Sequence, residues 1–174
     1  MNIFKTGYIV AIINNYQKFS YTLWPLTNIE NDVNAEKLVA EGDERWFMVY
    51  DMLEIAPDFD YASRYNEYCR SIGMNTTILM VESLYNYFDV QDNKTISTIY
   101  GYDCIGTIGY SYLDNDRDIF EKDFEKNGIK INQYGLFDSI ESVKIFAQLR
   151  NKYISDGNDI ENYWDMIPIR LCQV

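Results

Sequence analysis

Apolar residues at helical spacing define the clearest element of the sequence, a helix over residues 139–153. On a helical projection its apolar side chains fill a wide arc and leave only a narrow polar stripe. The stripe consists of Glu141, Lys144, Gln148 and Lys152. Asp138 precedes the helix and Glu141 follows three residues later, which is the spacing of a capping box. We therefore expect a core helix that is buried on both flanks and capped by Asp138.

The middle of the chain has the same helical spacing in several shorter segments. Residues 34–40 and 44–55 predict two helices, the second ending before Pro57. Residues 60–73 predict a third helix, ending at Gly73. Its apolar side carries Tyr61, Tyr65, Tyr68 and Cys69. Residues 77–88 could form a helix or a strand, and their length and apolar spacing favour a helix.

Strands are predicted near both ends of the chain. Residues 8–13 form a continuous apolar run rich in β-branched residues, which is typical of a strand covered on both faces. Residues 19–26 indicate a second short strand, paired with the first as a hairpin. Residues 95–102 are β-branched and aromatic, and residues 166–174 alternate apolar and polar side chains. Pro168 limits the last strand to a sheet edge or places it at the strand's start.

Together these elements predict an α+β fold in which an antiparallel or mixed sheet is backed by helices. A chain of 174 residues has the length of one domain, so we assign residues 1–174 to a single domain. Its helix-rich acidic region covers about 30–90, and its β-rich part about 95–174.

A formal net charge of −12 is the strongest global feature of the composition. Residues 30–67 contain most of it, with eleven acids against three bases. Such a charge argues against nonspecific binding to nucleic acid or anionic membrane, because bases must neutralise phosphates there. It favours a basic protein partner. An acidic surface that serves only solubility is an equal alternative.

The chain contains no histidine, which excludes Ser-His-Asp and Cys-His catalysis and histidine-ligated metals. Paired acids remain as candidates for catalysis, namely Asp58 with Asp60 and Asp51 with Glu54. Each pair lies at a predicted helix end or face, where solvated acids are ordinary. We expect no enzymatic activity and no cofactor, and keep a carboxylate enzyme with a divalent metal as an alternative.

An acidic cluster at 114–125 has acids at the positions of a calcium-binding loop. However, Ile119 stands where such a loop has its turn glycine, and Lys122 stands at the position of a calcium ligand. The same acids would favour the positive end of a helix dipole. A third reading is an exposed anionic patch that meets Lys or Arg on a partner. The candidate partner-binding residues are Asp114, Asp116, Asp118, Glu121, Tyr110, Tyr112, Asp58 and Asp60.

Three widely spaced cysteines, Cys69, Cys104 and Cys172, contain no Cys-x-x-Cys pair. An odd number without a motif predicts reduced, half-buried thiols in a cytoplasmic protein. The apolar run at 8–13 is too short to span a membrane.

Short motifs in the second half of the chain resemble a known family. They are Tyr100-Gly101-Tyr102-Asp103, Tyr112-Leu113-Asp114-Asn115, Asn132-Gln133-Tyr134-Gly135-Leu136-Phe137-Asp138 and an apolar closing strand at 167–171. This combination resembles the bacterial immunity proteins of contact-dependent inhibition and related polymorphic toxin systems. The resemblance covers about residues 100–174.

The resemblance implies a small protein that binds one cognate toxin domain, often a nuclease, and blocks its active site or substrate surface. It transfers no catalytic residue. Together with the charge, it predicts a non-enzymatic inhibitor that occludes a basic partner. A phage-encoded inhibitor or nucleic-acid mimic directed at a host defence nuclease is the related alternative, and genomic setting separates the two.

Overall fold

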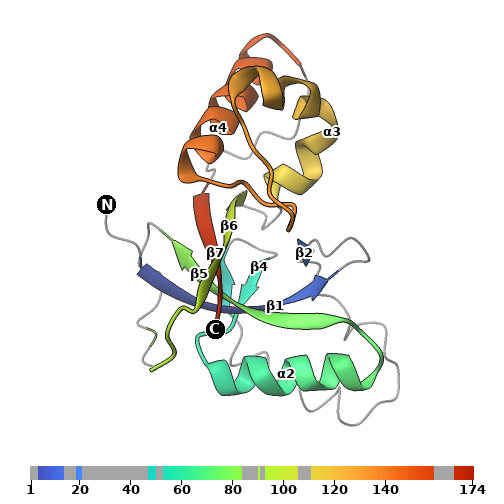
Figure 1. The fold of residues 1–174 in the computed structure, drawn as a ribbon, viewed down its shortest axis with the longest axis vertical. Coiled ribbons are helices and arrows are strands. Elements are labelled where there is room, and N and C mark those ends of the chain that lie inside the picture. The colour runs from blue at the N-terminus through green and yellow to red at the C-terminus, as the bar shows by residue number, and fades with distance from the viewer. Residues whose placement is uncertain are drawn as a thin grey trace.

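The computed structural model of the chain describes residues 4–13, 19–20, 47–49, 53–83, 90, 93–105, 111–158 and 167–174. Five strands form one sheet in the order β2-β1-β5-β7-β6, and every neighbouring pair is antiparallel. The strands are β1 (Phe4–Ile13), β2 (Phe19–Ser20), β5 (Thr76–Ser83), β6 (Thr98–Ile105) and β7 (Ile167–Gln173). Helices lie on either side of this sheet, which confirms the α+β fold class (Figure 1).

β1 is covered on both faces, as its continuous apolar run predicts. Successive side chains of a strand point to opposite faces, yet Tyr8, Ile9, Val10 and Ala11 are all buried. β1 also pairs with β2 through Ile12↔Ser20 and Ile13↔Phe19, so the predicted hairpin is confirmed. The rest of the predicted 19–26 strand lies outside the described residues.

The prediction of a helix over 44–55 is wrong for the residues that the structure describes. They form two short antiparallel strands, β3 (Phe47–Val49) and β4 (Leu53–Ile55). Directly after β4, the N–H of Ala56 donates to the oxygen of Tyr8 at 2.9 Å and the N–H of Tyr8 donates back at 2.8 Å. Pairing with the side of β1 that faces away from β5 satisfies this backbone without a helix. The predicted helix at 34–40 lies outside the described residues.

The prediction of a helix over 77–88 is also wrong, because its first part is the strand β5. β5 lies between β1 and β7, and Leu79, Met80 and Val81 are all buried. A strand covered on both faces has a continuous apolar run, and spacing alone does not distinguish such a run from a buried helix. Residues 84–88 lie outside the described part.

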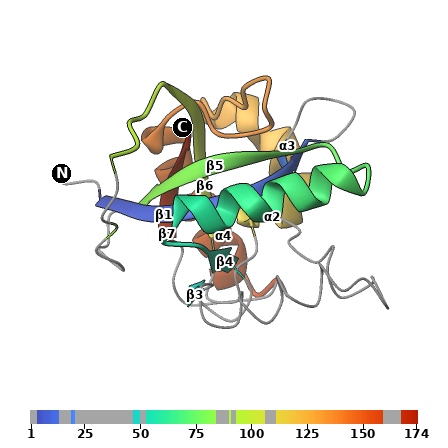
Figure 2. The same ribbon diagram turned by 90° about the horizontal axis from the view of Figure 1, so that it is seen from below.

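α2 (Phe59–Ser71) is the helix predicted at 60–73 and lies along β1 and β5 (Figure 2). Asp58 caps it, because one carboxylate oxygen accepts from the N–H of Asp60 at 2.8 Å and of Tyr61 at 3.2 Å. The predicted apolar side, which comprises Tyr61, Tyr65, Tyr68 and Cys69, is buried.

α3 (Tyr112–Phe124), the short 3-10 helix η1 (Glu125–Asn127) and α4 (Ile140–Ser155) form the opposite helical layer, next to β6 (Figure 1). α4 confirms the predicted helix, and its four-residue polar stripe is exposed. The acidic cluster at 114–125 therefore lies mostly in a helix and does not form a loop.

The predicted cap of α4 is wrong by one residue. Ser139 is the N-cap, and its Oγ accepts from the N–H of Ser142 at 3.2 Å. Asp138 instead accepts from the hydroxyl of Ser142 at 2.8 Å. Glu141 faces solvent, and its carboxylate lies 3.3 Å from Nζ of Lys144 on the same helix. A serine and an aspartate in adjacent positions are both good caps, and only the backbone angles decide between them.

β7 confirms the predicted C-terminal strand, with Pro168 at its start. Pro168 is opposite Cys104 on β6, while the register with β5 begins at Ser83↔Ile169. β7 is therefore an interior strand whose proline lies beyond the described ladder with β5. Among the described residues, no helix has the length and apolar character needed to cross a membrane.

Candidate partner-binding surface

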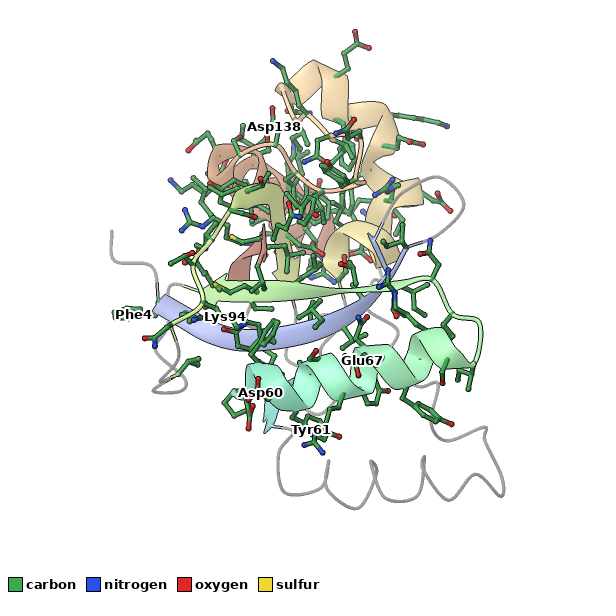
Figure 3. All side chains as sticks on the ribbon, turned by 60° about the horizontal axis from the view of Figure 1, so that its bottom comes forward. Phe4, Asp60, Tyr61, Glu67, Lys94 and Asp138 are labelled. Atoms are coloured by element: carbon green, nitrogen blue, oxygen red, sulfur yellow. The ribbon has the colours of Figure 1, made fainter. Side chains whose placement is uncertain are left out.

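The exposed acids predicted to bind a partner lie on two opposite sides of the molecule. Asp60 is exposed on the first turn of α2, whereas Asp118 and Glu121 are exposed on α3. α2 and α3 are separated by the sheet (Figure 1). Figure 3 likewise shows Asp60 on α2 and Asp138 beside α4, on the other side of the sheet. These acids therefore do not form one patch.

Asp116 does not belong to an exposed patch, and this part of the prediction is wrong. Its side chain is buried, and one carboxylate oxygen lies 2.5 Å from Nε of Arg150 on α4. Arg150 is itself only 1% exposed. A buried charge requires a partner of opposite sign, so this pair joins α3 to α4 and leaves Asp116 unable to meet another protein.

The remaining predicted residues fall into two groups. Asp58 is half-buried, and its carboxylate is used to cap α2. Tyr112 and Asp114 lie on the backbone of α3, but their side chains are outside the described part, as is the whole of Tyr110. The acids of the apparent calcium loop belong to a helix, and no group of three or more potential metal ligands occurs among the residues that the structure describes.

The exposed surface of α3 and η1 carries both signs of charge. Asp118, Glu121 and Glu125 are interspersed with Lys122 and Lys126, and all five residues are exposed. Mixed charges at such spacing are typical of a solvated helix face. The exposed charges described on this surface are therefore three negative and two positive.

Most of the negative charge lies in one stretch of the sequence. Residues 30–67 contain eleven acids against three bases, a net charge of −8 out of −12 for the whole chain. Within this stretch, residues 30–51 contribute seven acids against two bases. The charge is therefore uneven along the sequence.

A second ion pair between an arginine and a carboxylate lies within the sheet. Glu82 on β5 and Arg170 on β7 are cross-strand neighbours, and Nε of Arg170 lies 2.5 Å from the Glu82 carboxylate. The thiol of Cys172 donates to the same carboxylate at 3.5 Å. Like Asp116, Glu82 is thus held in a structural contact.

All three cysteines are free and buried, more deeply than their sequence predicts. Burial raises the pKa of the Cys69 thiol to about 11 and that of Cys172 to about 12, the latter with a contribution from the nearby Glu82. Burial also raises the pKa of Cys104. The thiolate is the reactive form, so these cysteines are poor nucleophiles at neutral pH.

Two motifs that are thirty residues apart in the sequence form one unit in the structure. Residues 130–138 make a tight hairpin, the edge hairpin, which lies against the outer edge of β6. The N–H of Tyr102 donates to the oxygen of Phe137, and the N–H of Phe137 donates back to Tyr102, both at 2.9 Å. The ring of Tyr134 packs edge-on against that of Tyr100, with 4.8 Å between the centroids.

Asn132 holds the edge hairpin together with its side-chain amide. Its Oδ1 accepts from the N–H of Tyr134 at 2.9 Å and of Leu136 at 3.2 Å. Its Nδ2 donates to the oxygen of Tyr100 on β6 at 2.7 Å. Gly101 allows this close approach, because a Cβ there would lie 2.7 Å from Asn132 Nδ2. Arg117 of α3 also donates to the oxygen of Gly135 at 2.8 Å.

β6 and the residues just before it expose apolar side chains next to the edge hairpin. Ile96 is 36% and Ile99 46% exposed, and Tyr100 and Tyr134 are half-buried. Exposed aliphatic and aromatic side chains on a rigid backbone are common at the centre of protein interfaces. The sequence shows these residues but does not show that residues 96–100 and 130–138 meet.

Comparison with known proteins gives no relative. The chain matches no family model, no curated protein and no solved structure.

Proposed function

We propose that this protein is a non-enzymatic acidic inhibitor that acts in the cytoplasm. It binds and occludes a basic partner protein, as an immunity protein does when it neutralises a cognate toxin nuclease. The partner contributes lysines and arginines that otherwise contact nucleic acid. No nucleic acid, membrane or cofactor takes part.

The uneven distribution of charge is the observation that carries this proposal. Residues 30–67 carry a net charge of −8, out of −12 for the whole chain. Acids that serve only solubility need no grouping along the chain, whereas residues 30–51 contain seven acids against two bases. Concentrated charge gives a directional field, which speeds the encounter with a partner of opposite sign.

The acids that are buried among the described residues favour a structural over a catalytic use. Asp116 and Glu82 are each paired with an arginine, and Asp103 accepts from the N–H of Cys104 at 2.7 Å. The half-buried Asp58 caps a helix. A general acid or base needs a carboxylate that can reach a substrate proton. These four carboxylates are engaged in contacts that hold the fold.

The test uses the product of the open reading frame next to this gene. Both proteins are purified and mixed at low and at physiological salt, and the complex is measured by calorimetry and size-exclusion chromatography. We expect a one-to-one complex that suppresses the toxicity of the neighbour on co-expression, and that weakens as salt rises. If there is neither a complex at low salt nor suppression of toxicity, the proposal is wrong.

A further inference from the structure

β7 enters the sheet between two strands that no tight turn connects to it. It is the last strand in the sequence, yet it lies between β5 and β6. The helices α3 and α4 come between β6 and β7 in the sequence. In a hairpin, the turn fixes which residues of the two strands are opposite each other. The alignment of β7 with its neighbours, its register, must therefore be fixed by side chains.

The register of β7 matters because this strand links two halves of the molecule. α2 lies along β1 and β5, whereas α3 and α4 lie next to β6 (Figure 1). β7 pairs with β5 on one side and with β6 on the other. A shift of β7 along β5 would therefore also shift β6 and the edge hairpin relative to α2.

Apolar burial alone does not select one register. Successive side chains of a strand point to opposite faces, yet Leu79, Met80 and Val81 of β5 are all buried, as are Leu171 and Cys172 of β7. Where one face of a sheet is solvated, a slip by one residue exposes the apolar side chains and is unfavourable. Here both faces are covered, so the apolar side chains would stay buried after a slip.

The charged residues of three neighbouring strands do distinguish one register from the others. β1, β5 and β7 each contain a single charged residue, namely Lys5, Glu82 and Arg170. Lys5 is opposite Glu82, and Glu82 is opposite Arg170. Side chains of directly opposite residues lie on the same face of a sheet, so these three form one row across it.

The contact between Glu82 and Arg170 exists only in the observed register. Nε of Arg170 lies 2.5 Å from one carboxylate oxygen of Glu82, and Nη2 contacts the same oxygen. The two side chains are only 20% and 10% exposed. A slip by one residue would put them on opposite faces, and a slip by two would put Glu82 opposite Pro168 or Cys172. Either slip leaves a largely buried charge without this partner, which is strongly unfavourable.

We propose that the Glu82–Arg170 pair is a register lock, which selects the one alignment in which β7 joins the two halves of the molecule. Its role is to exclude slipped registers rather than to add stability, because apolar residues of similar size can replace a buried ion pair at little cost. Fixing the register is a use for which buried polar groups are well suited. This inference does not depend on the proposed function.

The test compares the double variant Glu82→Leu with Arg170→Met against the wild type by NMR spectroscopy of isotope-labelled protein. We expect the double variant to fold but to show more than one set of amide signals for β7. Cross-strand nuclear Overhauser effects between β5 and β7 should assign these sets to different registers. Arg170→Lys keeps a positive charge opposite Glu82 and should give one set, in the wild-type register.

The matched control is Asp116→Leu with Arg150→Met, which removes a buried arginine–carboxylate pair from the helices instead of the sheet. It should leave β7 with one set of signals. A single, wild-type register in the folded Glu82→Leu, Arg170→Met protein overturns the proposal, and so do slipped registers in the control or in Arg170→Lys. Should the double variant fail to fold, Glu82→Gln with Arg170→Met serves instead and is judged by the same criteria. Loss of folding in both would also overturn the proposal, because the pair would then be needed for stability.

Discussion

The two helical layers of this protein are attached to the sheet by different chemistry. α2 meets β1 and β5 through uncharged side chains, among them Tyr8, Tyr61, Ala62 and Met80. α3 and α4 contact each other and β6 through aromatic rings. The ring centroids of Phe120 and Phe137 lie 5.5 and 5.2 Å from that of Phe146. This second layer also encloses the Arg150–Asp116 pair.

The difference matters because a buried ion pair and an apolar contact fail in different ways. Truncating an apolar contact loses burial in proportion to the atoms removed. Removing one member of a buried pair leaves a charge with no solvent and no partner. The α3–α4 layer should therefore be the more sensitive to a single substitution, and its ion pair specifies which faces of the two helices meet.

The largest effect is expected for Arg150→Met. The change leaves Asp116 buried without its partner and should lower the free energy of unfolding by about 3–5 kcal/mol. The measurement is urea unfolding followed by circular dichroism. In the double variant with Asp116→Leu neither charge of this pair remains, and much of the loss should be recovered. A double variant that is less stable than Arg150→Met alone would contradict this account of the layer.

Gly7→Ala tests the close contact between β1 and the end of β4. An added Cβ would lie 2.7 Å from the oxygen of Ala56 and would also meet Ile55, and the residue has a φ of +148°. We expect a loss of about 2–4 kcal/mol in urea unfolding from crowding and backbone strain together. Gly73→Ala is the control, since nothing lies within 4 Å of its added Cβ. It should cost only about 1 kcal/mol for its positive φ, and equal losses at both positions would refute the close contact.

Asp58→Ala and Ser139→Ala compare the first turns of the two layers. Each removes an N-cap, and each should lower the free energy of unfolding by about 1 kcal/mol. Asp138→Ala leaves the cap of α4 in place and removes only the bond from Ser142. If Asp138→Ala destabilises the protein while Ser139→Ala does not, the assignment of the cap is reversed.

The smallest effect is expected for Lys144→Ala. The Lys144–Glu141 pair lies on the same helix as Arg150, but its side chains are 57% and 67% exposed. An exposed pair contributes little because water solvates both charges, so the change should stay below about 0.5 kcal/mol. A loss similar to that of Arg150→Met would show that burial does not separate the two pairs.

The elements found correctly from sequence are those whose contacts are local. The burial of α2 follows from the spacing of Tyr61, Tyr65 and Cys69, and that of α4 from its apolar arc. β5 was mistaken for a helix because Leu79, Met80 and Val81 are buried on both faces, which removes the alternation that marks a strand. Its identity depends on β1 and β7, which lie far away in the sequence.

The candidate site was less predictable than the fold. The role of each of its residues depends on a contact with a residue that lies far away in the sequence. Asp116 and Asp118 look alike in sequence, but Arg150 is thirty-four residues beyond the first and buries it. The meeting of Asn132 with Tyr100 has no local signal either. The net charge and its concentration in residues 30–67 were readable directly from the sequence.

The most direct test of the central claim compares two variants that lose the same number of negative charges. One neutralises Glu36, Glu41, Asp43 and Glu44, and the other neutralises the exposed acids Asp60, Asp118, Glu121 and Glu125. The association rate constant with the product of the adjacent open reading frame is measured by stopped flow at low salt. We expect the first variant to associate at least about tenfold more slowly, and the second to change by less than about twofold. Equal slowing in both variants would contradict the claim that concentrated charge directs binding.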